Sequence, residues 1–165
     1  MDWTKQIVRF VVLLLLQVLL VNNLQFLGVC HPYIYLLGLL ALPLVLPRWA
    51  DMLIGVGVGL LMDVFCNSLG VHTAACVMVM YMRPYLVNRY VTDMDRFNKE
   101  VSIGSIGLLN YVLYTSFLIV LHHTMVFYLT AWSVQHFWFT LLEVVVSSVV
   151  TFVLIMAYSL ISEKR

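Results

Sequence analysis

The composition of this chain of 165 residues excludes an ordinary soluble globular protein. Hydrophobic residues make up 63% of the chain and charged residues 10%, whereas soluble domains contain about 25% charged residues. The mean hydropathy is +1.00. The net charge is only +1, and no basic patch predicts nucleic acid as a partner. We therefore expect membrane lipid to be the solvent of most outward side chains.

The apolar residues fall into six segments of roughly the length that crosses a bilayer. A hydrocarbon core about 30 Å thick needs about 20 helical residues. The predicted helices cover residues 7–21, 33–46, 52–68, 71–87, 101–121 and 137–161. The sequence thus predicts an all-α, polytopic membrane protein in which residues 1–165 form one bundle of six transmembrane helices. Little of the chain remains for a soluble catalytic domain.

The Lys and Arg residues predict the orientation of this bundle. All nine fall in segments that this topology places on one side, whereas the connections 22–32, 66–70 and 122–136 contain none. Basic residues favour the cytoplasmic side, so both termini and the polar connection 88–100 should be cytoplasmic. The basic start followed by an apolar run is also typical of a signal peptide. No small-residue cleavage site follows, and we interpret the run as a retained first helix.

The second predicted span contains helix breakers. Pro32 can begin it, whereas Pro43 and Pro47 bend or end it, because proline lacks a backbone N–H group. Irregular backbone at membrane depth is tolerated only where protein buries it. We therefore expect a short, broken helix that packs inside the bundle.

Two connections have compositions of their own. Residues 88–100 are strongly polar and form either a solvated turn or a docking site for a cytoplasmic partner. Residues 125–132 are rich in aromatic side chains and too short to span a bilayer. Aromatic segments of this kind favour the membrane interface. We expect this segment to lie flat on the outer surface.

Two acidic residues, Asp63 and Glu143, lie inside the predicted spans. An ionisable group within a bilayer is costly unless it is paired, protonated or next to water. We expect no basic residue within the bundle to pair with either acid. Each one therefore either hydrogen-bonds a neighbouring helix as a structural group or belongs to a functional site.

Glu143 is also part of a polar stripe on the last predicted helix. The stripe follows a helical spacing, so its members share one face, which must turn inward. It consists of His136, Thr140, Glu143, Ser147, Thr151 and Tyr158. The stripe either lines a substrate cavity or hydrogen-bonds neighbouring helices.

Glycine and cysteine residues suggest structural roles. Gly55, Gly57 and Gly59 predict a face of the third helix that approaches another helix closely. Cys30 and Cys66 are expected near the same membrane surface, where they form either a disulfide or ordinary thiols.

No motif in the sequence predicts catalysis or cofactor binding. The histidines are expected at the outer surface or just beneath it, without the spacing of a metal site: His31, His72, His122, His123 and His136. No pair of nucleophile and base is recognisable. We predict no enzymatic activity, no metal and no cofactor.

The third and fourth predicted helices resemble those of the rod shape-determining protein MreD family. Members have a glycine-rich helix that ends in G-L-L-x-D, a short outer turn, an L-G pair and a second helix that ends near a Tyr. The matching residues here are Gly59 to Asp63, Leu69 with Gly70, and Tyr81. The motif covers about 30 residues, whereas length and six spans match over the whole chain. The turn 66–68 lacks the glycine that many members have.

This resemblance implies a non-enzymatic scaffold in the bacterial inner membrane. Such a protein would bind MreC and link the actin-like MreB to the RodA glycosyltransferase and its penicillin-binding transpeptidase. The motif residues would be partner-binding or structural: Gly55, Gly59, Asp63, Gly70 and Tyr81.

Two other classes of function remain open. The MreD family is similar in helix arrangement to substrate-binding components of energy-coupling-factor vitamin transporters, which would place a pocket at the level of Asp63 and Glu143. Such components need an alanine face on the first helix, and here that helix is mainly Leu and Val. A membrane enzyme would have to use Asp63 with Glu143 or a histidine. We favour the scaffold.

Overall fold

The computed structural model describes residues 3–21, 28–43, 46–90, 100–131 and 137–163. The elements in these ranges are helices, which confirms the predicted all-α class. They are α1 (Trp3–Leu19), α2 (Leu36–Leu40), α3 (Arg48–Cys66), α4 (Val71–Tyr90), α5 (Ile103–Ile106), α6 (Leu108–Ala131) and α7 (Phe137–Glu163).

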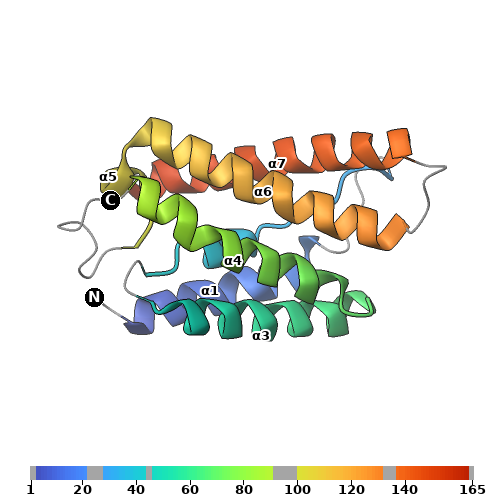
Figure 1. Ribbon diagram of the computed structural model, residues 1–165, viewed down its shortest axis with the longest axis horizontal. Helices are drawn as coiled ribbons and strands as arrows, with labels where there is room; N and C mark the ends of the chain where they lie inside the picture. Colours follow the sequence, from blue (N-terminus) through green and yellow to red (C-terminus); the bar gives the residue numbers. More distant parts are fainter. Residues whose placement is uncertain (1–2, 22–27, 44–45, 91–99, 132–136, 164–165) are drawn as a thin grey trace.

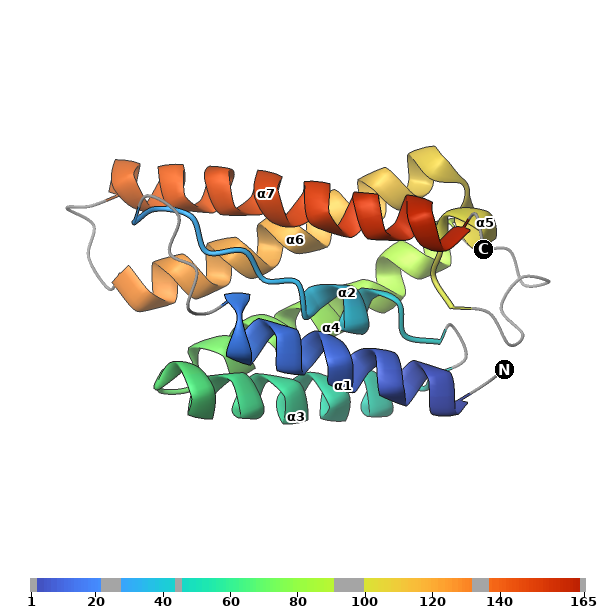
Figure 2. The same cartoon turned by 180° about the vertical axis from the view of Figure 1, so that it is seen from behind.

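The long helices run side by side along the longest axis of the molecule (Figure 1). Helices α1 and α3 form one side of the bundle, α6 and α7 form the other, and α4 lies between them, as both views show (Figure 2). The most extensive packing joins α3 to α4, α4 to α6 and α6 to α7. The start of α1, the short α5 and the end of α7 lie at one end of the bundle.

The helices α3, α6 and α7 are long and apolar enough to cross a membrane. The apolar stretch Gln6–Leu19 within α1 is shorter. These lengths are compatible with a membrane protein. Many large apolar side chains point outward from the bundle, for example Leu53 on α3 and Val149 on α7, as expected where lipid is the solvent.

Two predictions about the fifth span are wrong. The predicted helix 101–121 is divided into α5 and α6, and α6 continues to Ala131. Gly107, with a φ of 81°, separates the two helices. The described part of the aromatic segment 125–132 is thus the last turns of α6 and does not lie flat. No Pro or Gly interrupts the sequence there, so the helical hydrogen bonds continue.

The second predicted span is broken and buried, as expected. Helix is limited to α2, and all five of its residues are buried. Residues 28–35 approach α2 as irregular backbone that runs between α1 and α7 (Figure 2). Tyr35 and Leu36 are completely buried. The connection 88–100 lies mostly outside the described residues, but Glu100 at its end pairs with Arg9 and accepts a hydrogen bond from Gln6.

A buried ion pair fixes the chain after α2. Arg83 of α4 donates to Asp51 of α3, with an Nη1–Oδ2 distance of 3.0 Å, and both side chains are 2% exposed. Arg83 also donates to the backbone oxygens of Leu42 and Pro43. The prediction about basic residues concerned Asp63 and Glu143, whereas the acid that pairs with Arg83 is Asp51, which the prediction did not count among the acids of the bundle. The sequence places Arg83 in a span, but its partner Asp51 lies just outside the predicted third helix.

We expect Arg83→Gln to lower the free energy of unfolding by about 3–5 kcal/mol, because it leaves the carboxylate of Asp51 buried and uncompensated. Thermal unfolding of the detergent-purified protein would measure the loss. Arg89→Gln, on the exposed surface of the same helix, should change stability by less than about 0.5 kcal/mol. Adding Asp51→Asn to Arg83→Gln should restore part of the loss, and equal stability of all variants would contradict the role of the pair.

Candidate functional site

Asp63 closes the turn between α3 and α4. Its Oδ1 accepts from the Ser68 hydroxyl at 2.6 Å and from the His72 N–H at 2.8 Å. Its Oδ2 accepts from the Thr73 N–H at 3.0 Å and from the Thr73 hydroxyl at 2.6 Å. The first N–H groups of a helix have no partner within the helix, and a negative charge near them is favourable. Asp63 therefore caps α4 from the neighbouring helix.

This arrangement refines the prediction for Asp63. The sequence predicted that Asp63 either hydrogen-bonds a neighbouring helix or belongs to a functional site. Its backbone donors come from the first turn of α4, because Asn67 takes a left-handed conformation with a φ of 52° and turns the chain back at once. Gly70 also has a positive φ, 81°. The turn 66–68 contains no glycine, and Asn67 takes the left-handed conformation that closes it.

Two of the three glycines of α3 are packed against α4. A Cβ atom on Gly59 would lie 2.3 Å from Thr73 Cα, and one on Gly55 would lie 2.8 Å from Met80 Cγ. The packing interpretation is therefore confirmed for Gly55 and Gly59, which are not free for a partner, whereas Gly57 lies on the opposite, exposed side of the helix. Tyr81 lies apart from these residues: it is 50% exposed and its hydroxyl bonds that of Tyr85.

The polar stripe of α7 bonds the irregular segment 28–35. Ser147 Oγ accepts from the His31 N–H at 3.0 Å, and Thr151 Oγ1 accepts from the Tyr33 N–H at 3.1 Å. From the other side, Gln17 of α1 accepts from the Ile34 N–H and donates to the Pro32 carbonyl. A buried irregular backbone must be satisfied in this way. These two members of the stripe therefore hold a segment of chain.

The other members of the stripe have different surroundings. Thr140 is buried, whereas Tyr158 is 40% exposed. Glu143 is half-buried and forms no hydrogen bond that the structure records with another described residue. His136 lies outside the described residues. The stripe is thus one face of the helix but not one site.

A buried cluster of histidine and tyrosine rings lies beside this segment, and sequence reasoning missed it. The Tyr35 hydroxyl is 2.6 Å from His122 Nε2, 3.4 Å from His72 Nδ1 and 3.5 Å from Cys76 Sγ. The ring of Tyr33 packs on the same histidines and on His123, with centroids 5.2–5.3 Å apart.

His122 and His123 are both completely buried inside the bundle, which excludes the exposed one of the two predicted positions, at the outer surface or just beneath it. Adjacent helical residues point about 100° apart, and α6 packs against α4 on one side and α7 on the other. Each ring therefore meets a different neighbour. The sequence did contain a signal for this burial. His122 and His123 lie within a long apolar run that has no Pro or Gly, so the helix continues past them.

The hydrogen bonds assign the protons of His123. Its Nδ1 lies 2.9 Å from the Ile119 carbonyl, which can only accept, so Nδ1 bears the proton. In the neutral ring Nε2 then accepts from the Thr151 hydroxyl, 3.2 Å away. The Thr151 hydroxyl also accepts a hydrogen bond from the Tyr33 N–H group. It therefore acts as both a donor and an acceptor. His122 Nδ1 is buried without a partner among the described residues.

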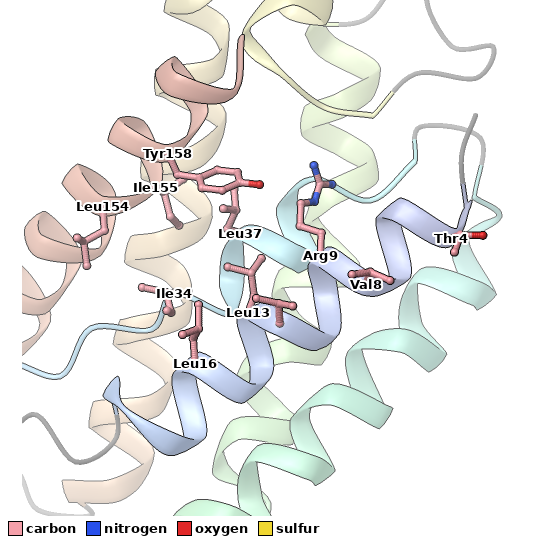
Figure 3. Close-up of a pocket in the computed structure, with 11 residues that line it drawn as sticks. Thr4, Val8, Arg9, Leu13, Leu16, Ile34, Leu37, Leu154, Ile155 and Tyr158 are labelled. Atoms are coloured by element: carbon pink, nitrogen blue, oxygen red, sulfur yellow. The ribbon is translucent and has the colours of Figure 1, made fainter. Parts of the chain in front are cut away.

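Two cavities border these elements. One, of about 440 Å³, lies at the Asp63 end of the bundle, beside the cluster of rings, and is lined by His31, Tyr33, Ser68, His72 and Thr130 among others. The larger, of about 610 Å³, is an apolar groove between α1 and α7 (Figure 3). Cys30 and Cys66 are thiols. Within the ranges that the structure describes, no three His, Cys, Asp or Glu residues are grouped to hold a metal ion.

Comparison with known proteins yields no match to a protein family, to a curated protein or to a solved structure.

We expect Asp63→Leu to be among the most damaging changes within the bundle, because it removes the acceptor of four hydrogen bonds and leaves the buried N–H group of His72 and the partly buried one of Thr73 without their acceptor. The loss of unfolding free energy should be at least about 3 kcal/mol. Yield and thermal unfolding in detergent would measure it.

Glu143→Gln is the matched control for Asp63→Leu, since Glu143 is the other acid of the predicted spans and forms no hydrogen bond with another residue of the described ranges. It should leave stability within about 0.5 kcal/mol of the native value. Native stability of Asp63→Leu would show that the cap is dispensable.

Proposed function

We propose that this chain is a non-enzymatic scaffold of the cell-elongation machinery, with six spans in the bacterial inner membrane and both termini in the cytoplasm. The three long apolar helices support the membrane location. The resemblance of residues 55–84 to the MreD family supports the biological setting.

Packing supports the three further spans. Helix α4 has 20 residues, about 30 Å, and runs beside α6 (Figure 1). Its polar groups Arg83 and His72 are buried, so they would not face lipid. The broken second span has its backbone bonded by side chains of α1 and α7. The apolar part of α1 is the third of these further spans.

The proposed topology predicts that a cysteine placed at Asn98 is labelled by an impermeant thiol reagent only after the cells are opened. The bias of Lys and Arg residues is the physical reason. A cysteine at Ser133, in the connection expected outside, is the matched control and should be labelled in intact cells. Labelling of the Asn98 position from outside would exclude the topology.

The observation that best supports a scaffold is the outward face of α3. Gly57 lies there, and a Cβ atom on it would meet nothing within 4 Å. Its neighbours on this face are large and exposed: Leu53 is 62% and Val64 78% exposed. A helical glycine costs up to about 1 kcal/mol relative to alanine, and packing among the described residues does not explain Gly57 as it explains Gly55 and Gly59.

Glycine flanked by large apolar residues allows another membrane helix to approach closely. We therefore place the single span of MreC against α3, over Gly57. The extracytoplasmic part of MreC would then lie above the turn that Asp63 closes, and MreB, RodA and the penicillin-binding transpeptidase would join through this complex. This surface replaces Gly55 and Gly59 as the proposed contact.

Gly57→Leu should reduce the amount of MreC from the same genome that co-purifies by about tenfold, equivalent to about 1.4 kcal/mol of binding. The added side chain meets open space, so the fold should be kept. Val149→Leu, on the exposed face of α7, is the control and should bind MreC normally. Undiminished MreC binding by folded Gly57→Leu would remove this face as the docking surface.

One observation favours the alternative, a substrate-binding component of a vitamin-type transporter. The cavity of about 440 Å³ has the size of a small-molecule site and presents polar groups from His31, Ser68 and His72. Binding of a vitamin by the purified protein, lost in His72→Phe, would favour that function over the scaffold.

A further inference from the structure

The apolar groove between α1 and α7 is open to the surroundings of the bundle. Its α1 wall includes Val8, Val12 and Leu16, which are four residues apart and so share one face. Its α7 wall includes Leu154 and Ile155, and Figure 3 shows the two walls facing each other. An apolar groove within the proposed membrane-spanning region would be filled by a hydrocarbon chain, because empty space forfeits dispersion contacts.

At the end where α1 begins and α7 ends, the groove meets a polar pocket of about 220 Å³. Both cavities are lined by Arg9, Leu37 and Tyr158. The Tyr158 ring extends from α7 toward Leu37 and Arg9 (Figure 3). The pocket adds the polar side chains of Glu100, Ser102, Ser159, Ser162 and Glu163. A long apolar compartment thus leads directly into a short polar one.

The charges of the polar pocket restrict what it can hold. Its described lining has one guanidinium, Arg9, and two carboxylates, Glu100 and Glu163, a net charge of −1. Arg9 is already paired with Glu100. A head group with only negative charge would be repelled, whereas a phosphate at Arg9 combined with an ammonium at Glu163 satisfies both signs.

We propose that this groove holds one membrane phospholipid with a zwitterionic, amine-bearing head group, with an acyl chain between α1 and α7 and the head group in the Arg9 pocket. The lipid would stabilise α1, whose packing against the other long helices is less extensive than theirs with one another. The site is independent of the α3 face assigned to MreC, so either assignment can fail alone.

The test uses the full chain reconstituted in vesicles of equal parts dioleoyl phosphatidylethanolamine and dioleoyl phosphatidylglycerol, then extracted in mild detergent for native mass spectrometry. The native protein should retain one phosphatidylethanolamine. Val12→Trp and Leu154→Trp, from opposite walls and both partly exposed, should each lower the lipid-bound fraction about tenfold, equivalent to about 1.4 kcal/mol. Val149→Trp, on α7 outside the groove, should retain the lipid.

The head group is tested separately with Glu163→Gln, which removes one carboxylate. The preference for phosphatidylethanolamine over phosphatidylglycerol should fall several-fold while total bound lipid stays near one. Equal retention of both lipids by the native protein would overturn the head-group assignment. Absence of retained lipid, equal retention by the tryptophan variants, or crosslinking of position 12 to a partner helix would overturn the lipid site.

Discussion

The structure depends on hydrogen bonding of an irregular segment that lies inside an apolar bundle. Residues 28–43 include only the short helix α2, so most of their backbone groups have no helical partner. In a medium without water each unsatisfied group is costly. Side chains therefore complete the bonding: Gln17 from α1, Arg83 from α4, Tyr114 from α6, and Ser147 with Thr151 from α7.

This requirement explains why buried polar side chains occur at these positions. Thr151 accepts from Tyr33 N–H and lies within hydrogen-bonding distance of His123, so one hydroxyl joins the segment, α6 and α7. Asp63 likewise satisfies backbone groups at the α3–α4 turn, where it accepts hydrogen bonds from the first N–H groups of α4. Polar residues within membrane helices are often functional, but the hydrogen-bonding capacity of Thr151 and Asp63 is largely used by the fold of this bundle.

The surfaces left for binding are consequently on the outside. Gly57 interrupts a ridge of large apolar side chains on α3, which suits a membrane helix, whereas the groove between α1 and α7 ends in a charged pocket, which suits an amphiphile. The two surfaces use different physical devices. Close backbone approach would favour the proposed helix at α3, and the change from apolar to charged lining would favour the proposed lipid at α1 and α7.

Local sequence determined the helical class, the breaks at Pro43 and Pro47, and the polar stripe, because hydropathy, proline geometry and helical spacing act over a few residues. Tertiary structure decided which groups meet. Arg83 reaches Asp51 across 32 residues, and Tyr35 reaches His122 across 87. No local pattern encodes such pairings. Whether Gly59 or Gly57 faces α4 follows from the rotation of α3, and that rotation is set by the whole bundle through close packing.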